Sequence, residues 1–200
     1  MEKNTKEKLI EAGEKLFALK GLAGVSIREL SQEAGANSAL ISYHFGSKEG
    51  LYAAVLENQF SPIGALLDSA AREDASPTEK IISYARNVAV VHGRVPFLTK
   101  FMMGEILNPS RFFEPVIRKY IERAYRFLTD TLNEGIACGE FRKDMDVKTA
   151  ALSLAGIINF YFISRPIFRH FVSDSSAQDE QYVMQAVDIF LNGVKHYDGQ

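Results

Sequence analysis

The chain has 200 residues, of which 46% are hydrophobic and 24% charged, and its formal net charge at pH 7 is −2. These proportions are typical of a soluble globular protein, and the near-neutral charge alone indicates neither a nucleic-acid nor a membrane partner. A single cysteine, Cys138, excludes an internal disulfide and fits a reducing compartment. The longest apolar run, 150–163, is too short to span a bilayer, and the N-terminus lacks a signal-peptide core. We therefore expect a cytoplasmic protein without a membrane partner.

The first twenty residues predict an amphipathic helix. Apolar side chains recur at helical spacing from Leu9 to Phe17, and lysines and glutamates occupy the other face. Gly13 lies in the apolar stripe, although glycine in a helix costs roughly 1 kcal/mol relative to alanine. We therefore expect a neighbouring helix to pack closely against Gly13. Lys20 and Gly21 are typical of a last helical turn and its left-handed cap.

Two short helices follow in quick succession. Ser26 and Glu29 have the spacing of a capping box, which predicts a helix that starts after Ser26 and ends at Gly35. Asn37 is a suitable cap for a third helix over 38–45, which Gly46 ends. So tight a turn between two helices is typical of a helix-turn-helix, whose second helix enters the major groove of DNA.

The third helix is expected to turn Ile41 and Phe45 inward, because they are four residues apart. Small side chains then face outward at its start, where they could touch base edges. The alternative is a purely structural three-helix unit. It stays open because the first fifty residues hold seven lysines plus arginines and seven glutamates, so they carry no excess positive charge.

Helix-stop signals continue along the chain, and no stretch has the alternation typical of strands. The sequence therefore predicts an all-α fold, with an N-terminal three-helix domain over 1–50 and a larger helical domain over 51–200. After a fourth helix over 48–60, the expected helices span 62–72, 77–93, 96–107, 115–138, 147–164 and 182–196. Pro62 is expected to begin one helix and Pro166 to break another, with a short helical extension to Phe171 as the alternative.

The last two long helices suggest an interface. The helix over 147–164 is apolar nearly all round, and a helix of this kind is buried on every side. One small domain offers one core face, so we expect the other face to meet a second subunit. The final helix adds an apolar stripe from Val183 to Val194, and two helices from each chain would form a four-helix interface. The alternative is an ordinary central helix of one domain.

Aromatic and methionine side chains crowd the middle of the chain. Such residues can line an adaptable apolar cavity, with Glu105 and Asn159 as polar anchors, although singly they are more often plain core. The candidate ligand-binding residues are Phe97, Phe101, Met102, Glu105, Phe112, Phe113, Tyr120, Asn159 and Phe160.

The segment from Thr5 to Phe60 resembles the DNA-binding domain of the tetracycline-repressor (TetR) family of bacterial transcription regulators. Its matching pieces are Phe17 to Gly21, Ser26 to Ala36, Tyr43-His44-Phe45 and Ser47 to Leu51. The DNA-binding residues that this resemblance implies are Ser26, Arg28, Asn37, Ser38, Ala39, Leu40, Ser42, Tyr43, His44 and Lys48. Within this set, Ser38 to Leu40 would contact base edges, and most of the others would contact phosphates.

The resemblance also implies a homodimeric repressor that leaves a palindromic operator when a small, largely apolar effector binds. Two alternatives are an activator or DNA-organising protein, and a helical carrier or enzyme that keeps the N-terminal unit as a scaffold. The chain has no Walker loop or nucleophile elbow, and its four histidines lack metal-ligand spacing. We therefore expect no enzyme activity, metal or cofactor.

Overall fold

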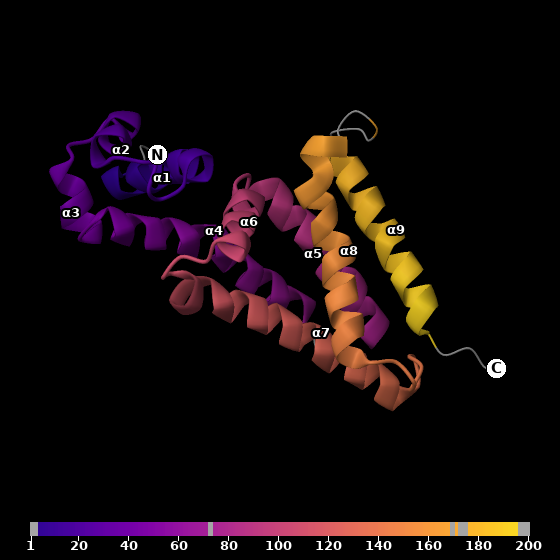
Figure 1. The fold of residues 1–200 in the computed structure, drawn as a ribbon. Coiled ribbons are helices and arrows are strands. Elements are labelled where there is room, and N and C mark those ends of the chain that lie inside the picture. The colour runs from indigo at the N-terminus through magenta and orange to yellow at the C-terminus, as the bar shows by residue number, and fades with distance from the viewer. Residues whose placement is uncertain (1–3, 72–73, 169–170, 172–175, 196–200) are drawn as a thin grey trace. The chain divides into compact units, whose positions relative to one another are not determined.

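The computed structural model describes residues 4–71, 74–168, 171 and 176–195, and its regular elements are helices (Figure 1). The bounds are α1 (Thr5–Lys20), α2 (Ile27–Ala34), α3 (Ala39–Phe45), α4 (Lys48–Ala70), α5 (Pro77–Arg94), α6 (Leu98–Leu107), the π-helical turn η1 (Phe113–Ile117), α7 (Arg118–Cys138), α8 (Val147–Phe168) and α9 (Ser176–Val194). Phe141 and Lys195 form an isolated β-bridge. The all-α prediction is confirmed.

The chain divides into two compact units and passes from one to the other inside α4, before α6 and inside α7. One unit comprises Met1–Ser61 with Phe97–Lys119, and the other comprises Pro62–Pro96 with Tyr120–Gln200. The segment that carries α6 and η1 therefore belongs with the N-terminal helices, although residues 62–96 separate them in the chain. A functional division at residue 50 stays a prediction.

The expectation that Pro62 begins a helix was wrong, and at Pro166 the structure shows the alternative, a helix that extends beyond the proline. α4 continues through Pro62 to Ala70, and α8 continues through Pro166 to Phe168. Proline removes one helical hydrogen bond and crowds the preceding turn, which usually ends a helix. In α4, Phe60 before the proline and Leu67 after it are buried, so packing holds both halves in place. α9 begins at Ser176, before the expected start. His196, the expected last residue of that helix, lies outside the described residues.

Local capping follows the sequence closely. The Glu29 amide donates to Ser26 Oγ at 3.2 Å, and the Ser26 amide donates to Glu29 Oε2 at 2.8 Å. Ser76 and Glu79 form the same reciprocal pair at the start of α5. Each capping box satisfies two amides that the first turn of a helix leaves without partners, so it sets where the helix starts.

Gly13 marks a close approach of α1 to α4, as expected. A Cβ built on Gly13 would lie 2.8 Å from Val55 Cγ2 and 3.3 Å from the ring of Phe17. Leu9 and Val55 are fully buried, so this contact lies in the core of the first unit. The glycine therefore gives up helix propensity in exchange for close packing of the two helices.

In the second unit, α5 packs against α9, and α8 packs against both. Figure 1 shows α8 and α9 side by side, running in opposite directions. Between them, the buried Asp179 accepts hydrogen bonds from Tyr161 Oη and Arg165 Nη1, both at 3.0 Å. The apolar stripe of α9 from Val183 to Val194 is buried within this unit, so it faces α5 and α8 instead of solvent.

α8 is covered on one face by its own unit, as the sequence predicts, and burial of its other face against a second subunit stays a prediction. Its inner face holds buried Leu154 and Ile158, whereas Leu152 is 62% and Phe160 61% exposed. By length and composition α8 could cross a membrane, contrary to the expectation drawn from 150–163, and about a third of the apolar window is buried in the protein. A core helix of a soluble protein can have the same length and composition, so these two properties are weak evidence for a membrane-spanning helix.

Candidate DNA interface and effector region

The turn between α2 and α3 is built by two residues that the sequence singled out. Gly35 adopts the left-handed conformation (φ 59°, ψ 37°) and ends α2. The N-cap of α3 is Ser38, whose side chain makes no capping hydrogen bond, so the prediction of Asn37 as the cap was wrong. Asn37 Oδ1 accepts a hydrogen bond from the Ala39 amide at 2.9 Å, which satisfies the first amide of the helix. Ile41 is fully buried and anchors the helix, and Phe45 is half-buried beside it. These contacts hold α3 with its other face outward.

The predicted DNA-binding residues all lie in the first compact unit. The exposed ones are Ser26, Arg28, Asn37, Ser38, Ala39, Ser42 and Tyr43, and the half-buried ones are Leu40, His44 and Lys48. Tyr43 is 80% exposed, with its ring edge-on to that of His44. The outward face of α3 thus presents small hydroxyl and methyl groups at its start and aromatic side chains near its end.

Lys48 has a structural role that the sequence did not reveal. Its Nζ donates hydrogen bonds to the carbonyl oxygens of Leu22 and Val25, both at 2.9 Å. These carbonyls lie in the loop between α1 and α2, so the first residue of α4 ties that loop in place. An ammonium has three donors, and the remaining one is available to a phosphate.

Most positive charge around α2 is already neutralised. Lys15 pairs with Glu33 at 2.7 Å and Lys20 with Glu29 at 2.6 Å. The hydrogen bond from Lys20, followed by those from Ser26, lowers the pKa of Glu29 to about 2. Arg28 has no ion-pair partner within the described part of the chain. It lines an open hollow of about 650 Å³ with Ile27, Ser31, Gln32, Gly35, Ala36 and Ser38.

Two family models match this chain. Residues 9–55 match "Bacterial regulatory proteins, tetR family", and residues 77–194 match the C-terminal domain of the HTH-type transcriptional dual regulator CecR. This chain belongs to the TetR family. It is therefore a DNA-binding transcription regulator with a helix-turn-helix and not an enzyme.

Similar TetR-family proteins span nearly the whole chain. The transcriptional repressor NicS of Pseudomonas putida is 24% identical over 196 residues, covering 96% of this chain and 92% of NicS. The structure of KstR2 from Mycobacterium tuberculosis aligns with a TM-score of 0.78 at 21% identity and covers 98% of both chains. PfmR from Thermus thermophilus aligns with a TM-score of 0.76 at 23% identity, covering 94% of this chain and 99% of PfmR. The fold is therefore that of TetR-family regulators over its full length.

Several candidate effector residues gather around Tyr52 of α4, which is not itself among the candidates. The Tyr52 ring lies 6.2 Å from that of Phe101 and 5.9 Å from that of Phe112. Its hydroxyl donates to Glu105 Oε1 at 2.6 Å, and Glu105 Oε2 accepts from the Ser110 amide at 2.9 Å. Glu105 is therefore a buried, hydrogen-bonded carboxylate. Phe97, Met102 and Phe113, from the same segment, are half-buried.

The remaining candidate effector residues lie in the second unit. Tyr120 is half-buried near Gly64. Asn159 Oδ1 lies 3.3 Å from His92 Nε2, and the imidazole stacks on Phe162 with ring centroids 4.1 Å apart. Phe160 is on the exposed side of α8, whereas His92 and Asn159 are half-buried. The nine candidates are thus divided between the two compact units.

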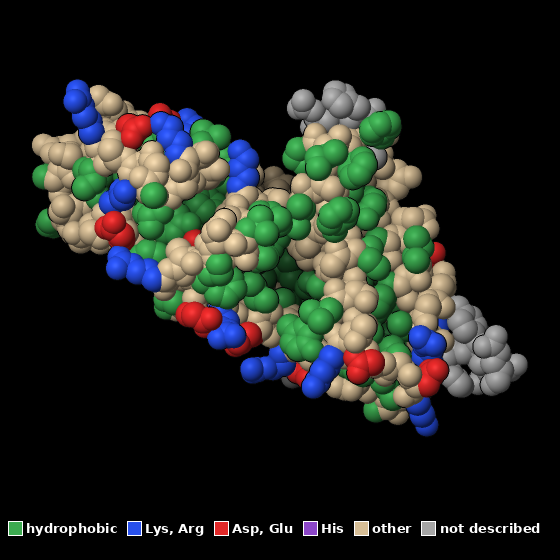
Figure 2. Space-filling model, viewed as in Figure 1, with side chains coloured by type: hydrophobic (Ala, Val, Ile, Leu, Met, Phe, Trp, Pro, Cys, Tyr) green, Lys and Arg blue, Asp and Glu red, His purple; other side chains and the backbone are tan. Residues whose placement is uncertain are grey.

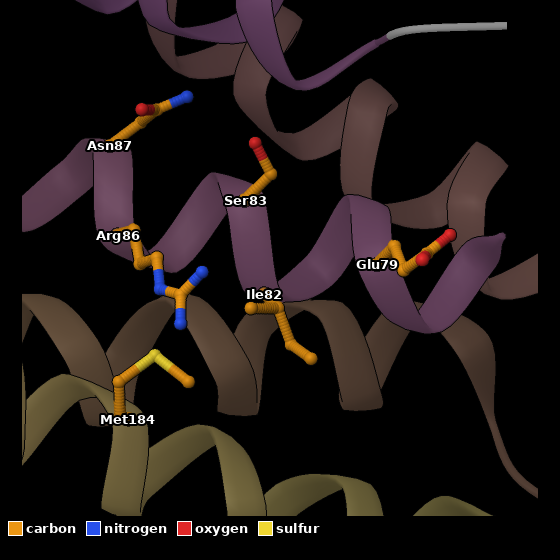
Figure 3. A pocket seen from close by; sticks show the side chains of 6 residues that line it. All are labelled: Glu79, Ile82, Ser83, Arg86, Asn87 and Met184. Atoms are coloured by element: carbon orange, nitrogen blue, oxygen red, sulfur yellow. The ribbon is translucent and has the colours of Figure 1, made fainter. Parts of the chain in front are cut away.

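A separate hollow of about 390 Å³ lies on α5 and α9, and none of the sequence candidates lines it. Figure 3 shows Ile82 and Arg86 turned toward Met184, and Ser83 and Asn87 on the other side of α5. Glu79 is engaged in the capping box of α5. The polar groups of this hollow do not converge on one point, so it is a poor candidate for the effector site.

Proposed function

We propose that this protein is a homodimeric repressor that binds a palindromic operator and is released from it by a small molecule. The supporting observation is the exposed outer face of α3, held outward by buried Ile41. NicS, KstR2 and AcnR, which are similar in sequence, are all named repressors. Ser38, Ala39 and Leu40 would contact base edges at the leading end of α3, and Arg28, Tyr43 and Lys48 would contact phosphates.

The proposed dimer interface is the outer face of α8, with the neighbouring face of α9. Figure 2 shows hydrophobic side chains gathered along α8. They include the exposed side chains of Leu152, Ile157, Phe160 and Ile167, with Ile189 from α9. Contiguous exposed apolar side chains of this kind mark an interaction surface. In two-fold dimers, recognition helices lie about 34–36 Å apart, or a multiple of that, to reach successive half-sites.

The oligomeric state tests this interface. Leu152→Glu combined with Phe160→Glu places two charges in the proposed contact, and sedimentation should then show a monomer. Leu19→Glu is the matched control, because Leu19 is 67% exposed and lies in the other compact unit. A double variant that sediments with the same mass as the unaltered protein would rule out α8 as the interface.

The proposed effector is largely apolar. The residues that favour this are the aromatic and methionine side chains of the segment 97–113. The FadR regulator of Bacillus subtilis, whose structure contains stearoyl-CoA, aligns with a TM-score of 0.75 at 16% identity. An effector acts by preferring one conformation over another, so affinity alone does not release DNA. Candidate ligands are therefore scored by how far they weaken operator binding.

Selection of bound duplexes from a random pool tests the DNA-binding proposal. The unaltered protein should enrich a palindrome, and Leu40→Ala should change the bases chosen at one or two positions in each half-site. Leu40 has no role in a capping hydrogen bond, and it is only half-buried, so the variant should fold. An unchanged base preference would show that Leu40 does not contact the base edges. Enrichment of no duplex at low salt would refute the regulator mechanism proposed here.

Activation is the second candidate function. CecR of Shigella flexneri, named a dual regulator, is 27% identical over 207 residues and covers 94% of this chain and 92% of CecR. A reporter placed downstream of the selected operator separates the two roles. Deletion of the regulator raises expression if it represses and lowers expression if it activates.

A further inference from the structure

Gln32 is an exposed residue of α2 to which neither the sequence pattern nor the family resemblance gave a role. It lies one helical turn after Arg28, so the two side chains share a face of α2. Both line the open hollow that Ser38 borders from the start of α3. Gln32 makes no side-chain hydrogen bond within the described residues, so its amide donors are available to a partner.

The other polar groups of this hollow are occupied. Ser31 Oγ donates to the Ile27 carbonyl at 2.7 Å. The amides of Gly35 and Ala36 donate to the carbonyls of Gln32 and Ser31 at the end of α2. The side-chain donors that remain for a ligand are therefore those of Arg28, Gln32 and Ser38. One is a cation and two are neutral, which suits an anion with several acceptor oxygens.

DNA seated against Ser38 must cover this hollow. In a helix-turn-helix the recognition helix enters the major groove, and the helix before it crosses the sugar-phosphate backbone. α2 is that preceding helix here, and Arg28 and Gln32 project from one side of it into the same hollow. Phosphates also accept more protein hydrogen bonds than base edges do.

We propose that the Gln32 side-chain amide donates a hydrogen bond to an operator phosphate beside the one that Arg28 contacts. Gln32 then positions α2 on the backbone and carries no base preference. This inference rests on the proposed placement of α3 in the major groove.

The salt dependence of binding distinguishes a neutral donor from a cation. Each phosphate that a lysine or arginine neutralises steepens the plot of log affinity against log salt by about 0.9. The proposed dimer carries every substitution twice, so the changes expected for one half-site are doubled for the whole operator. Gln32→Ala should weaken operator binding about tenfold per half-site, as expected for a lost hydrogen bond to a charged group. It should leave that slope and the selected bases unchanged. Arg28→Ala should weaken binding and also flatten the slope by about 0.9 per half-site.

Gln32→Lys is the sharper variant, because it adds a cation opposite the proposed phosphate. Its slope should steepen by about 0.9 per half-site relative to the unaltered protein. Asn133→Lys on α7 adds the same charge in the other compact unit, where it should leave the slope unchanged. Since Gln32 and Asn133 are both exposed, thermal unfolding should show native folding for every variant.

The probe is the duplex that the unaltered protein selects from a random pool. Binding of this duplex with undiminished affinity by Gln32→Ala, or an unchanged slope for Gln32→Lys, would overturn the inference alone. Altered base selection by Gln32→Ala would also overturn it, because Gln32 would then read sequence. If the unaltered protein selects no duplex, the proposed operator binding fails and this inference fails with it.

Discussion

The hydroxyl of Tyr52 lies 2.6 Å from a carboxylate oxygen of Glu105, which is 53 positions further along the chain. Burial, followed by the hydrogen bond to Glu105, raises the pKa of Tyr52, so the phenol stays a donor. The same ring meets Phe17 of α1 edge-on, with centroids 5.1 Å apart. Tyr52 therefore joins α1, α4 and α6 within the compact unit that carries the helix-turn-helix.

Tyr52→Phe should lower the free energy of unfolding by about 1–3 kcal/mol. It keeps the ring contacts and removes one of the two hydrogen bonds to the buried Glu105, and an undersatisfied buried group costs that much. Denaturant unfolding measures the change. Tyr43→Phe is the matched control, since Tyr43 is exposed and its variant should unfold like the unaltered protein. Equal stability of the two variants would mean that the Tyr52–Glu105 bond contributes little.

Gly13→Ala should destabilise the protein by about 1 kcal/mol, although alanine favours helix by a similar amount. The new methyl group would meet Val55 Cγ2 at 2.8 Å in a packed core, and overpacking typically costs 1–3 kcal/mol. Gly104→Ala in α6 is the control, because nothing lies within 4 Å of its built Cβ. That variant should be at least as stable as the unaltered protein. A stabilised Gly13→Ala would show that Val55 moves aside at little cost.

Lys48→Ala should have two separable effects. Loss of the bonds to the Leu22 and Val25 carbonyls should lower the free energy of unfolding by about 1 kcal/mol. Loss of a phosphate contact should weaken binding to all sequences alike and lower the salt slope by about one per half-site. Thermal unfolding and salt titrations of operator affinity measure the two. Reduced stability with an unchanged slope would assign Lys48 to the loop alone.

His92 makes stability depend on pH. Burial lowers the pKa of His92 to about 4, against the weaker raising effects of Asn159 and Asp179, whereas the unfolded value is 6.5. The unfolded chain therefore binds more protons between these values, so stability is present above about pH 6.5 and falls as the pH drops toward 4. The loss should reach up to about 3 kcal/mol, since each pKa unit is worth about 1.4 kcal/mol.

Denaturant unfolding at pH 7 and pH 4.5 measures this contribution from His92. His92→Gln removes the titrating group, so the stability difference between the two pH values should shrink. If the variant and the unaltered protein show the same stability difference between the two pH values, groups other than His92 cause the loss of stability in acid.

Hydrogen bonds between residues two or three positions apart determined the starts of α2 and α5 and the turn before α3. Ser26 with Glu29, Ser76 with Glu79, and Asn37 each act within three residues of themselves. The helix-stop signals, together with the absence of strand-like alternation, were enough to give the all-α class. These features were predictable because their partners are close in the chain, where spacing alone fixes geometry.

Contacts between distant residues were decided only by the tertiary structure. Packing on both sides of Pro62 kept α4 continuous, and the partners of Lys48 are carbonyls more than twenty positions away. Phe160 and Asn159 are adjacent in sequence, yet one is exposed on α8 and the other meets His92. Apolar residues on every side of α8 could not show which face the fold would cover. Burial depends on which helices pack together, and the spacing of residues along one helix does not specify its packing partners.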